Sequence, residues 1–173
     1  AEKILSLKNL GHEIGVVIGG GNIFRGIQQG ASWGISRTPA DQIGMLATLI
    51  NGIVLNEALA KLKCKVKMIT AIDCPSVAEK YQWANVMRYF QDEYIVLFVG
   101  GTGHPYFTTD TTAALRANEI QADIFLKATT KVDGIYHADP VKVATAKKYD
   151  KISYMDVLTQ NLGVMDSTAI SLC

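Results

Sequence analysis

Tyr94-Ile-Val-Leu-Phe-Val99 runs directly into Gly100-Gly-Thr-Gly103, and this stretch decides the fold. A continuous apolar run that ends on glycine is typical of a strand buried on both faces of a sheet. The pattern occurs once before, where the apolar residues 13–18 end on Gly19-Gly-Gly21. Two such strands predict a parallel sheet whose carboxyl ends turn on glycine, where ligands of open α/β sheets bind.

Helical patterns alternate with these strands. We expect one helix to begin with Thr38 as its N-cap, Pro39 as its first residue and Asp41 as its third. Its apolar residues recur at a spacing of about 3.6, which predicts the face that packs on the sheet. That face is Ile43, Leu46, Ala47, Ile50, Val54, Ala58 and Leu62.

The remaining elements complete an alternating order. We predict helices over residues 4–10, 77–91 and 109–122, and strands over 65–72 and 123–128. A capping box at Ser153–Asp156 predicts a last helix that ends near Gly163. The order predicts an α/β fold, namely a three-layer α/β/α sandwich around a mainly parallel sheet, in a single domain over residues 1–173.

Composition narrows the function. The 17 Lys and Arg residues nearly balance the 16 Asp and Glu residues, for a net charge of +1, which argues against nucleic acid or an anionic membrane as partner. The longest apolar run, 14–18, is too short to cross a bilayer. Three cysteines without metal or redox spacing, and no signal peptide, indicate a cytoplasmic protein. The three histidines show no metal-ligand spacing either.

The first glycine cluster is a candidate phosphate site. Gly20 and Gly21 would let backbone amides approach an anion, and the nearby guanidinium of Arg25 suits phosphoryl oxygens. The alternative is a tight turn followed by an ordinary surface arginine. A glycine triplet alone does not decide between them.

The second cluster, Gly101-Thr-Gly-His-Pro-Tyr-Phe-Thr-Thr-Asp110, offers more chemistry. Thr108 or Thr109 would cap the following helix and bond an anion at its N-terminus. Tyr106 or Phe107 would lie against a flat base, and Asp110 would accept a hydrogen bond or help to place Mg²⁺. The alternative is a plain N-cap with the aromatic side chains in the core.

A third segment, 127–140, combines hydroxyls, an Asp-Gly turn and an acidic residue before proline. Tyr136 and Asp139 would frame an adenine and its ribose, or the segment is simply a turn. Other nucleotide signatures are missing from the sequence: there is no Walker loop, no third glycine of a dinucleotide fingerprint, and no protein-kinase motif.

Taken together and in order, segments 17–26, 41–48, 101–110 and 131–140 closely resemble the bacterial UMP kinases of the amino-acid kinase superfamily. The resemblance implies transfer of the γ-phosphoryl group of Mg-ATP to UMP, giving UDP and ADP. It implies that Arg25 lies near the transferred group. We predict Arg25 and Asp110 as the catalytic residues, with Asp110 organising the phosphate-binding cluster, and no metal ligand on the protein. The resemblance implies UMP contacts at Gly20, Asp41, Thr102, Gly103, His104, Pro105, Tyr106, Phe107, Thr108 and Thr109, and ATP contacts at Gly21, Arg25, Thr129, Thr130, Tyr136 and Asp139.

The resemblance also implies a cytoplasmic homohexamer of pyrimidine biosynthesis that needs Mg²⁺, is activated by GTP and is inhibited by UTP. The chain departs from the family at His104, commonly Asn, and at Thr129-Thr130, which is one residue longer. We see no match to the family's first strand with its phosphate-contacting lysine, nor to its last strands, and expect this chain to lack them. Two alternatives are a sister kinase acting on carbamate or acetylglutamate, and a nucleotide-sensing module without turnover.

Overall fold

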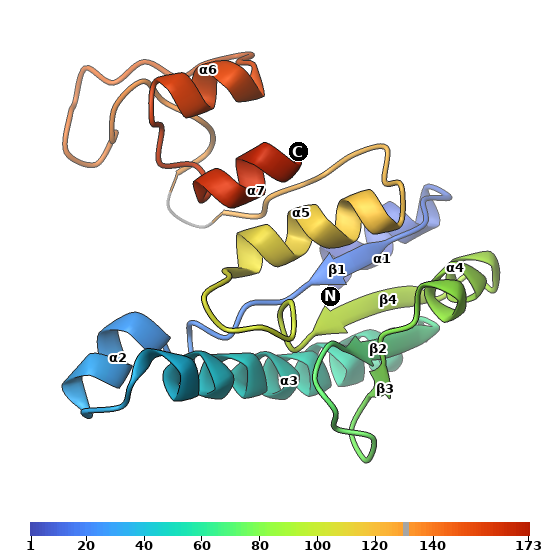
Figure 1. Cartoon of the computed structure of the whole chain (residues 1–173). Helices are drawn as coiled ribbons and strands as arrows, with labels where there is room; N and C mark the ends of the chain where they lie inside the picture. The colour runs from blue at the N-terminus through green and yellow to red at the C-terminus, as the bar shows by residue number, and fades with distance from the viewer. Residues whose placement is uncertain (130–131) are drawn as a thin grey trace.

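One parallel sheet organises the chain (Figure 1). The computed structural model describes residues 1–129 and 132–173, and their strands pair in the order β1-β4-β2-β3. All three pairings are parallel, so the predicted sheet is confirmed. The strands are β1 (Gly15–Val17), β2 (Val66–Thr70), β3 (Glu79–Lys80) and β4 (Ile95–Val99).

The central strand β4 is buried on both faces, which gives three layers. Ile95 and Leu97 pack with α1 and α3, whereas Val96 and Phe98 pack with α4 and the end of α5. Figure 1 shows α3 and α5 on opposite sides of the strands, so the predicted sandwich is confirmed. The helices of the described residues are α1 (Glu2–Asn9), α2 (Gly26–Ser32), α3 (Arg37–Lys61), α4 (Trp83–Gln91), α5 (Thr109–Glu119), α6 (Tyr154–Thr159) and α7 (Ser167–Leu172).

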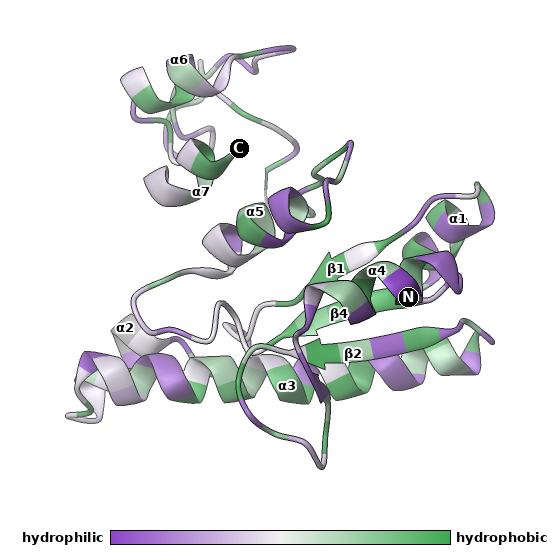
Figure 2. Cartoon of the chain, turned by 45° about the vertical axis from the view of Figure 1, so that its right-hand side comes forward, coloured by the Kyte–Doolittle hydropathy of each residue, from purple (hydrophilic) through white to green (hydrophobic). Residues whose placement is uncertain are grey.

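Helix α3 turns only part of the predicted face to the sheet. Ala47 is buried as predicted, but Leu46 and Val54 are 51% and 64% exposed, and Ile50 is also exposed. Leu59, which lies outside the predicted face, is buried. The reason is close packing, because small residues let the helix approach the strands. A Cβ on Gly52 would lie 2.5 Å from Cγ1 of Val99. In Figure 2 the ribbon of β4 is hydrophobic green, whereas α3 alternates hydrophobic and hydrophilic colours.

Among the described residues, α3 is also the one helix long and apolar enough to cross a membrane by length and composition. Those two criteria are equally met by the central helix of a folded domain. Here α3 packs on β2 and β4 through its small residues, with Met68 and Val99 against Gly52.

The start of α3 corrects a second prediction. The helix begins at Arg37 after Ser36, so Thr38 is not the N-cap and Asp41 is the fifth residue rather than the third. Pro39 is tolerated at the third position because the first amides of a helix have no intrahelical acceptor. Asp41 is thereby placed one turn into the helix.

Two other predicted elements differ. Helix α4 begins at Trp83 rather than 77, because Glu79 and Lys80 first pair with β2 as β3. Residues 123–128 form no strand, and Ile124 and Leu126 are exposed. A strand needs a neighbouring edge, and this segment pairs with none among the described residues.

The C-terminal residues form two short helices, of which only the first was predicted. The capping box is present, since Ser153 accepts a hydrogen bond from the Asp156 amide, but α6 ends at Thr159 rather than near Gly163. Helix α7 was not predicted, and it packs along α5 with Ala169 and Ile170 buried.

Candidate functional site

The two glycine turns meet at one cavity of about 560 Å³ at the carboxyl ends of β1 and β4. The N-terminal part of α3 and the N-terminus of α5 complete its wall. Of the residues predicted from the sequence, those that line it are Gly20, Gly21, Arg25, Asp41, Thr102, His104, Phe107, Thr108 and Thr109. Lining residues that sequence reasoning missed are Phe24, Gly26, Arg37, Gly44, Met45, Thr48, Gly101 and Thr112.

The first turn is pressed against α3. A Cβ on Gly20 would lie 2.7 Å from the carbonyl oxygen of Gly44 and 2.8 Å from Cβ of Ala47. Nδ2 of Asn51 donates to the carbonyl oxygen of Gly19 over 2.7 Å. Only glycine fits such a contact, so this turn is fixed to the helix that carries Asp41.

Arg25 is held at one end of its guanidinium. Its Nε donates to the carbonyl oxygen of Gly21 over 3.0 Å. The bond fixes the plane of the guanidinium at the cavity wall, and the two Nη groups extend beyond the bonded Nε. The geometry suits an arginine that meets an anion.

The second turn depends on backbone that favours glycine. Gly100 has a φ of 79°, and its amide donates to Oγ1 of Thr48 over 2.7 Å. Thr48 is the buried hydroxyl that sequence reasoning missed, because it sits inside an apolar stretch of α3. This bond ties the end of β4 to α3 beneath the cavity.

Asp41 joins α3 to the loop that follows the second turn. Its Oδ2 accepts from Nε of Arg37 over 2.6 Å and from the amide of Tyr106 over 2.8 Å. Tyr106 has a φ of 72°, an uncommon conformation for a residue with a side chain. The predicted UMP residue Asp41 is therefore held on two sides in the wall.

The N-terminus of α5 lines the cavity, and two sets of hydrogen bonds hold it in place. Thr108 accepts from the Thr111 amide over 3.1 Å, as predicted for the N-cap. The hydroxyls of Thr108 and Thr111 in turn donate to the carboxylate of Asp166, the N-cap of α7. Burial alone would raise the pKa of Asp166, but these bonds and the Ala169 amide outweigh it and hold the pKa below its ordinary value.

Asp110 lies in the first turn of α5 but does not line the cavity. Its Oδ2 is 2.5 Å from Nζ of Lys127, which also donates to the carbonyl oxygen of Val164 over 3.0 Å. Lys127 is the first residue of the third segment, and it is not among the predicted site residues. The pair connects α5 to the chain beyond it.

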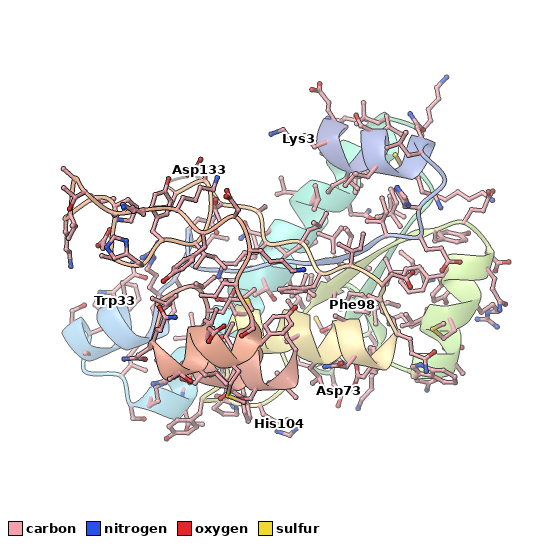
Figure 3. All side chains as sticks on the ribbon, turned by 90° about the horizontal axis from the view of Figure 1, so that it is seen from above. Lys3, Trp33, Asp73, Phe98, His104 and Asp133 are labelled. Atoms are coloured by element: carbon pink, nitrogen blue, oxygen red, sulfur yellow. The ribbon has the colours of Figure 1, made fainter. Side chains whose placement is uncertain are left out.

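The predicted ATP residues of the third segment lie apart from the cavity. Thr129 donates to the carbonyl oxygen of Val132, Tyr136 donates to Asp133 over 2.7 Å, and Asp139 accepts from the Val141 amide over 3.0 Å. Thr130 lies outside the described residues. Figure 3 shows Asp133 in this loop and His104 on opposite sides of the view.

Three predicted UMP residues are also absent from the cavity wall. Gly103 and Pro105 belong to the same loop without lining the cavity. Tyr106 reaches the site through its backbone, and its ring is exposed beneath the guanidinium of Arg37 at 5.1 Å from the centroid. Phe107, by contrast, lines the cavity with half of its surface exposed.

Comparison with known proteins defines the class. The model of the amino acid kinase family matches residues 1–173. The parallel sheet, with a cavity formed by two glycine turns at the carboxyl ends of its strands, is consistent with that match. The chain therefore belongs to the amino acid kinase family.

Two relatives give a comparison narrower than the family. The chain is 58% identical to a uridylate kinase of Protochlamydia amoebophila over 99% of its own length and 68% of that protein. It is 52% identical to a uridylate kinase of Magnetococcus marinus, again over 99% of its length and 70% of that protein.

Solved structures agree with this fold. The UMP kinase of Ureaplasma parvum superposes with a TM-score of 0.95 at 40% identity, over 99% of this chain and 72% of that one. The UMP kinase of Bacillus anthracis superposes with the same score at 42% identity, over 99% and 70%.

Proposed function

We propose that this chain is a UMP kinase, which transfers the γ-phosphoryl group of ATP to UMP and releases UDP and ADP. One observation carries the proposal. Arg25, Asp41 and the N-terminus of α5 converge on one cavity, in a chain 58% identical to a uridylate kinase. The reaction would serve pyrimidine nucleotide synthesis in the cytoplasm.

The acceptor nucleotide occupies the side of the cavity formed by α3 and the 101–109 loop. Asp41 accepts hydrogen bonds from ribose hydroxyls, since a carboxylate is the strong acceptor that such a diol requires. Phe107 lies against the uracil. Thr108 and Thr109 meet the acceptor phosphate at the N-terminus of α5, where unpaired amides and the helix dipole favour an anion.

The transfer itself needs positioning and charge neutralisation more than covalent chemistry. The phosphate of UMP already carries a nucleophilic oxygen, so no strong base is required. Arg25 and the amides of Gly20 and Gly21 neutralise charge on the moving phosphoryl group. The carboxylate of Asp110 forms an ion pair with Lys127 and holds the ammonium group of Lys127 beside α5.

The adenosine of ATP is assigned to the third segment, through Thr129 or Thr130, Tyr136 and Asp139. Mg²⁺ arrives with ATP as part of the substrate. The described residues hold no group of three or more His, Cys, Asp or Glu side chains that would form a metal cage. Magnesium carried by phosphates needs only one or two protein carboxylates.

A homo-oligomer is proposed as well, and the exposed apolar face of α3 supports it. Leu46, Ile50, Ile53 and Val54 are all large apolar side chains exposed on one helix. Soluble monomers rarely leave such a face uncovered. We propose a hexamer, with GTP as activator and UTP as inhibitor, and light scattering together with both nucleotides in the assay tests all three.

The experiment that tests the function offers UMP, CMP, AMP and GMP in turn with Mg-ATP and measures ADP and the diphosphate formed. UDP formation well above that of the other diphosphates is the expected result. Turnover of carbamate or acetylglutamate instead would assign a sister kinase. Nucleotide binding without any ADP release would assign a sensing module.

A further inference from the structure

Arg37 is the second guanidinium in the cavity wall, and no sequence motif pointed to it. It is the first residue of α3, and its side chain is 36% exposed. Its Nε bonds to Oδ2 of Asp41, whose side chain is only 15% exposed. Arg25 and Arg37 are thus each fixed through Nε, one to a backbone carbonyl and one to a carboxylate.

The contact is more than an ion pair along one helix. The guanidinium of Arg37 also covers the ring of Tyr106, which lies 65 residues further along the chain than Asp41. Tyr106 donates its amide to the same Oδ2, with its backbone in the left-handed region. Arg37, Asp41 and Tyr106 therefore form one cluster that closes the 101–109 loop onto α3.

The two carboxylate oxygens of Asp41 have different surroundings. Oδ2 receives both donors, from Arg37 and from Tyr106. Oδ1 lies beside Gly26, where an added Cβ would come within 2.9 Å of it. Because Gly26 lines the cavity, Oδ1 lies at the cavity wall, whereas Oδ2 is taken up by the two donors.

We infer that Arg37 is a positioning residue for the acceptor nucleotide: with the Tyr106 amide, it orients Asp41 so that Oδ1 meets the ribose hydroxyls. This inference rests on the proposed function and deepens it. Arg37 touches the sugar only through Asp41, so its removal should affect recognition of the ribose and leave the transfer step nearly unchanged.

The test compares Arg37→Ala with the wild-type protein in equilibrium dialysis against UMP and 2′-deoxy-UMP, together with steady-state kinetics. We expect Kd and KM for UMP to rise about tenfold, the effect of one charge-assisted hydrogen bond, with kcat within about twofold. The wild-type preference for UMP over 2′-deoxy-UMP should shrink in the variant. A structural defect would instead weaken both ligands equally.

Arg88→Ala is the matched control, because Arg88 lies on α4, covers the ring of Tyr89 at 5.5 Å and is outside the cavity wall. It should leave both dissociation constants unchanged. If circular dichroism shows that Arg37→Ala does not fold, Arg37→Lys replaces it in the comparison of UMP with 2′-deoxy-UMP. The lysine keeps the charge but not the planar contact with Tyr106, so a partial loss of ribose preference is expected.

Two results would overturn the inference, and they differ. In the first, the wild-type protein binds UMP, and Arg37→Ala and Arg37→Lys have the same Kd and the same preference for the ribose. This result would show that Arg37 does not orient Asp41, and it would leave the proposed function standing. Wild-type protein that binds no UMP would overturn the proposed function and the inference with it.

Discussion

Nζ of Lys127 lies 2.5 Å from Oδ2 of Asp110, so the first turn of α5 is joined to the segment that follows the helix. Both side chains are about two-thirds buried, at 34% and 31% exposed. Removing one partner of such a pair leaves the other charge uncompensated, which costs more than the loss of a surface pair. The pair therefore links the acceptor side of the site to the third segment.

We expect Asp110→Asn to lower kcat on the order of 100-fold with little change in KM for UMP, because it breaks the ion pair with Lys127 that holds the first turn of α5 beside the site of transfer. Steady-state kinetics with UMP and Mg-ATP measure this. Asp73→Asn is the control, since Asp73 pairs with Lys80 at 2.7 Å on an exposed surface. A control as slow as Asp110→Asn would mean that the effect is not specific to the site.

Arg25→Ala should lose far more kcat than affinity for UMP. Its guanidinium is fixed by the Gly21 carbonyl at the wall of the cavity, ready to meet charge that develops during transfer. The loss of one preorganised donor typically costs about 10²–10³ in rate. Near-normal kcat would show that Arg25 is an ordinary surface residue.

Asp41→Asn should mainly raise the KM for UMP. The amide cannot accept from the ribose with the strength of a carboxylate, and the loss of a charge-assisted bond costs about 1.5–3 kcal/mol. A fall in kcat with unchanged KM for UMP would contradict the assignment. If Asp41 only held Arg37 and Tyr106, the variant would lose stability and keep normal kinetics.

Acid should destabilise the packing of α7 on α5 through Asp166. Its folded-state pKa lies below the ordinary value, so its contribution to stability is complete above the unfolded pKa and is lost as the pH falls through the folded value. Urea unfolding at several pH values measures this. Asp166→Ala should lower the free energy of unfolding by about 0.5–2 kcal/mol at pH 7, as for other lost N-caps, and flatten its dependence on pH below 5.

The sequence was sufficient for the sheet and for the convergence of several motifs on one cavity. Apolar runs that end on glycine are a local signal, and β1 and β4 carry it. The motifs around Gly20, Arg25 and Asp41 did converge, because strands in one parallel sheet end at the same edge.

The predictions that were wrong or incomplete concern features that depend on contacts between segments distant in the sequence. The face of α3 was only partly right: Ala47 is buried as predicted, but the sheet accepts Gly52 where periodicity favoured Leu46, Ile50 and Val54. Arg37 and Thr48 were missed because Tyr106, whose ring Arg37 covers, and Gly100, whose amide Thr48 accepts, lie more than 50 residues away. Residues 123–128 have strand composition, but no local pattern tells whether a partner edge is present.

Helix α3 carries two glycines, Gly52 and Gly44, whose surroundings differ. A Cβ on Gly52 would lie 2.5 Å from Cγ1 of Val99 and 2.8 Å from Sδ of Met68, so the helix must shift away from β4 or the side chains must leave their rotamers. Overpacking of this kind costs about 1–3 kcal/mol. A Cβ on Gly44 would meet no atom within 4 Å, so alanine there only removes the entropic cost of glycine, about 0.5–1 kcal/mol.

Gly52→Ala should therefore lower the free energy of unfolding measured in urea, and Gly44→Ala should raise it. Stability is the right measurement, because Gly44 lines the cavity and its variant affects ligands for a separate reason. Equal gains from both substitutions would mean that α3 stands further from β4 than the packing of Val99 requires. The exposed stripe of Leu46, Ile50 and Val54 would then be free to turn toward the sheet, as the sequence periodicity first predicted.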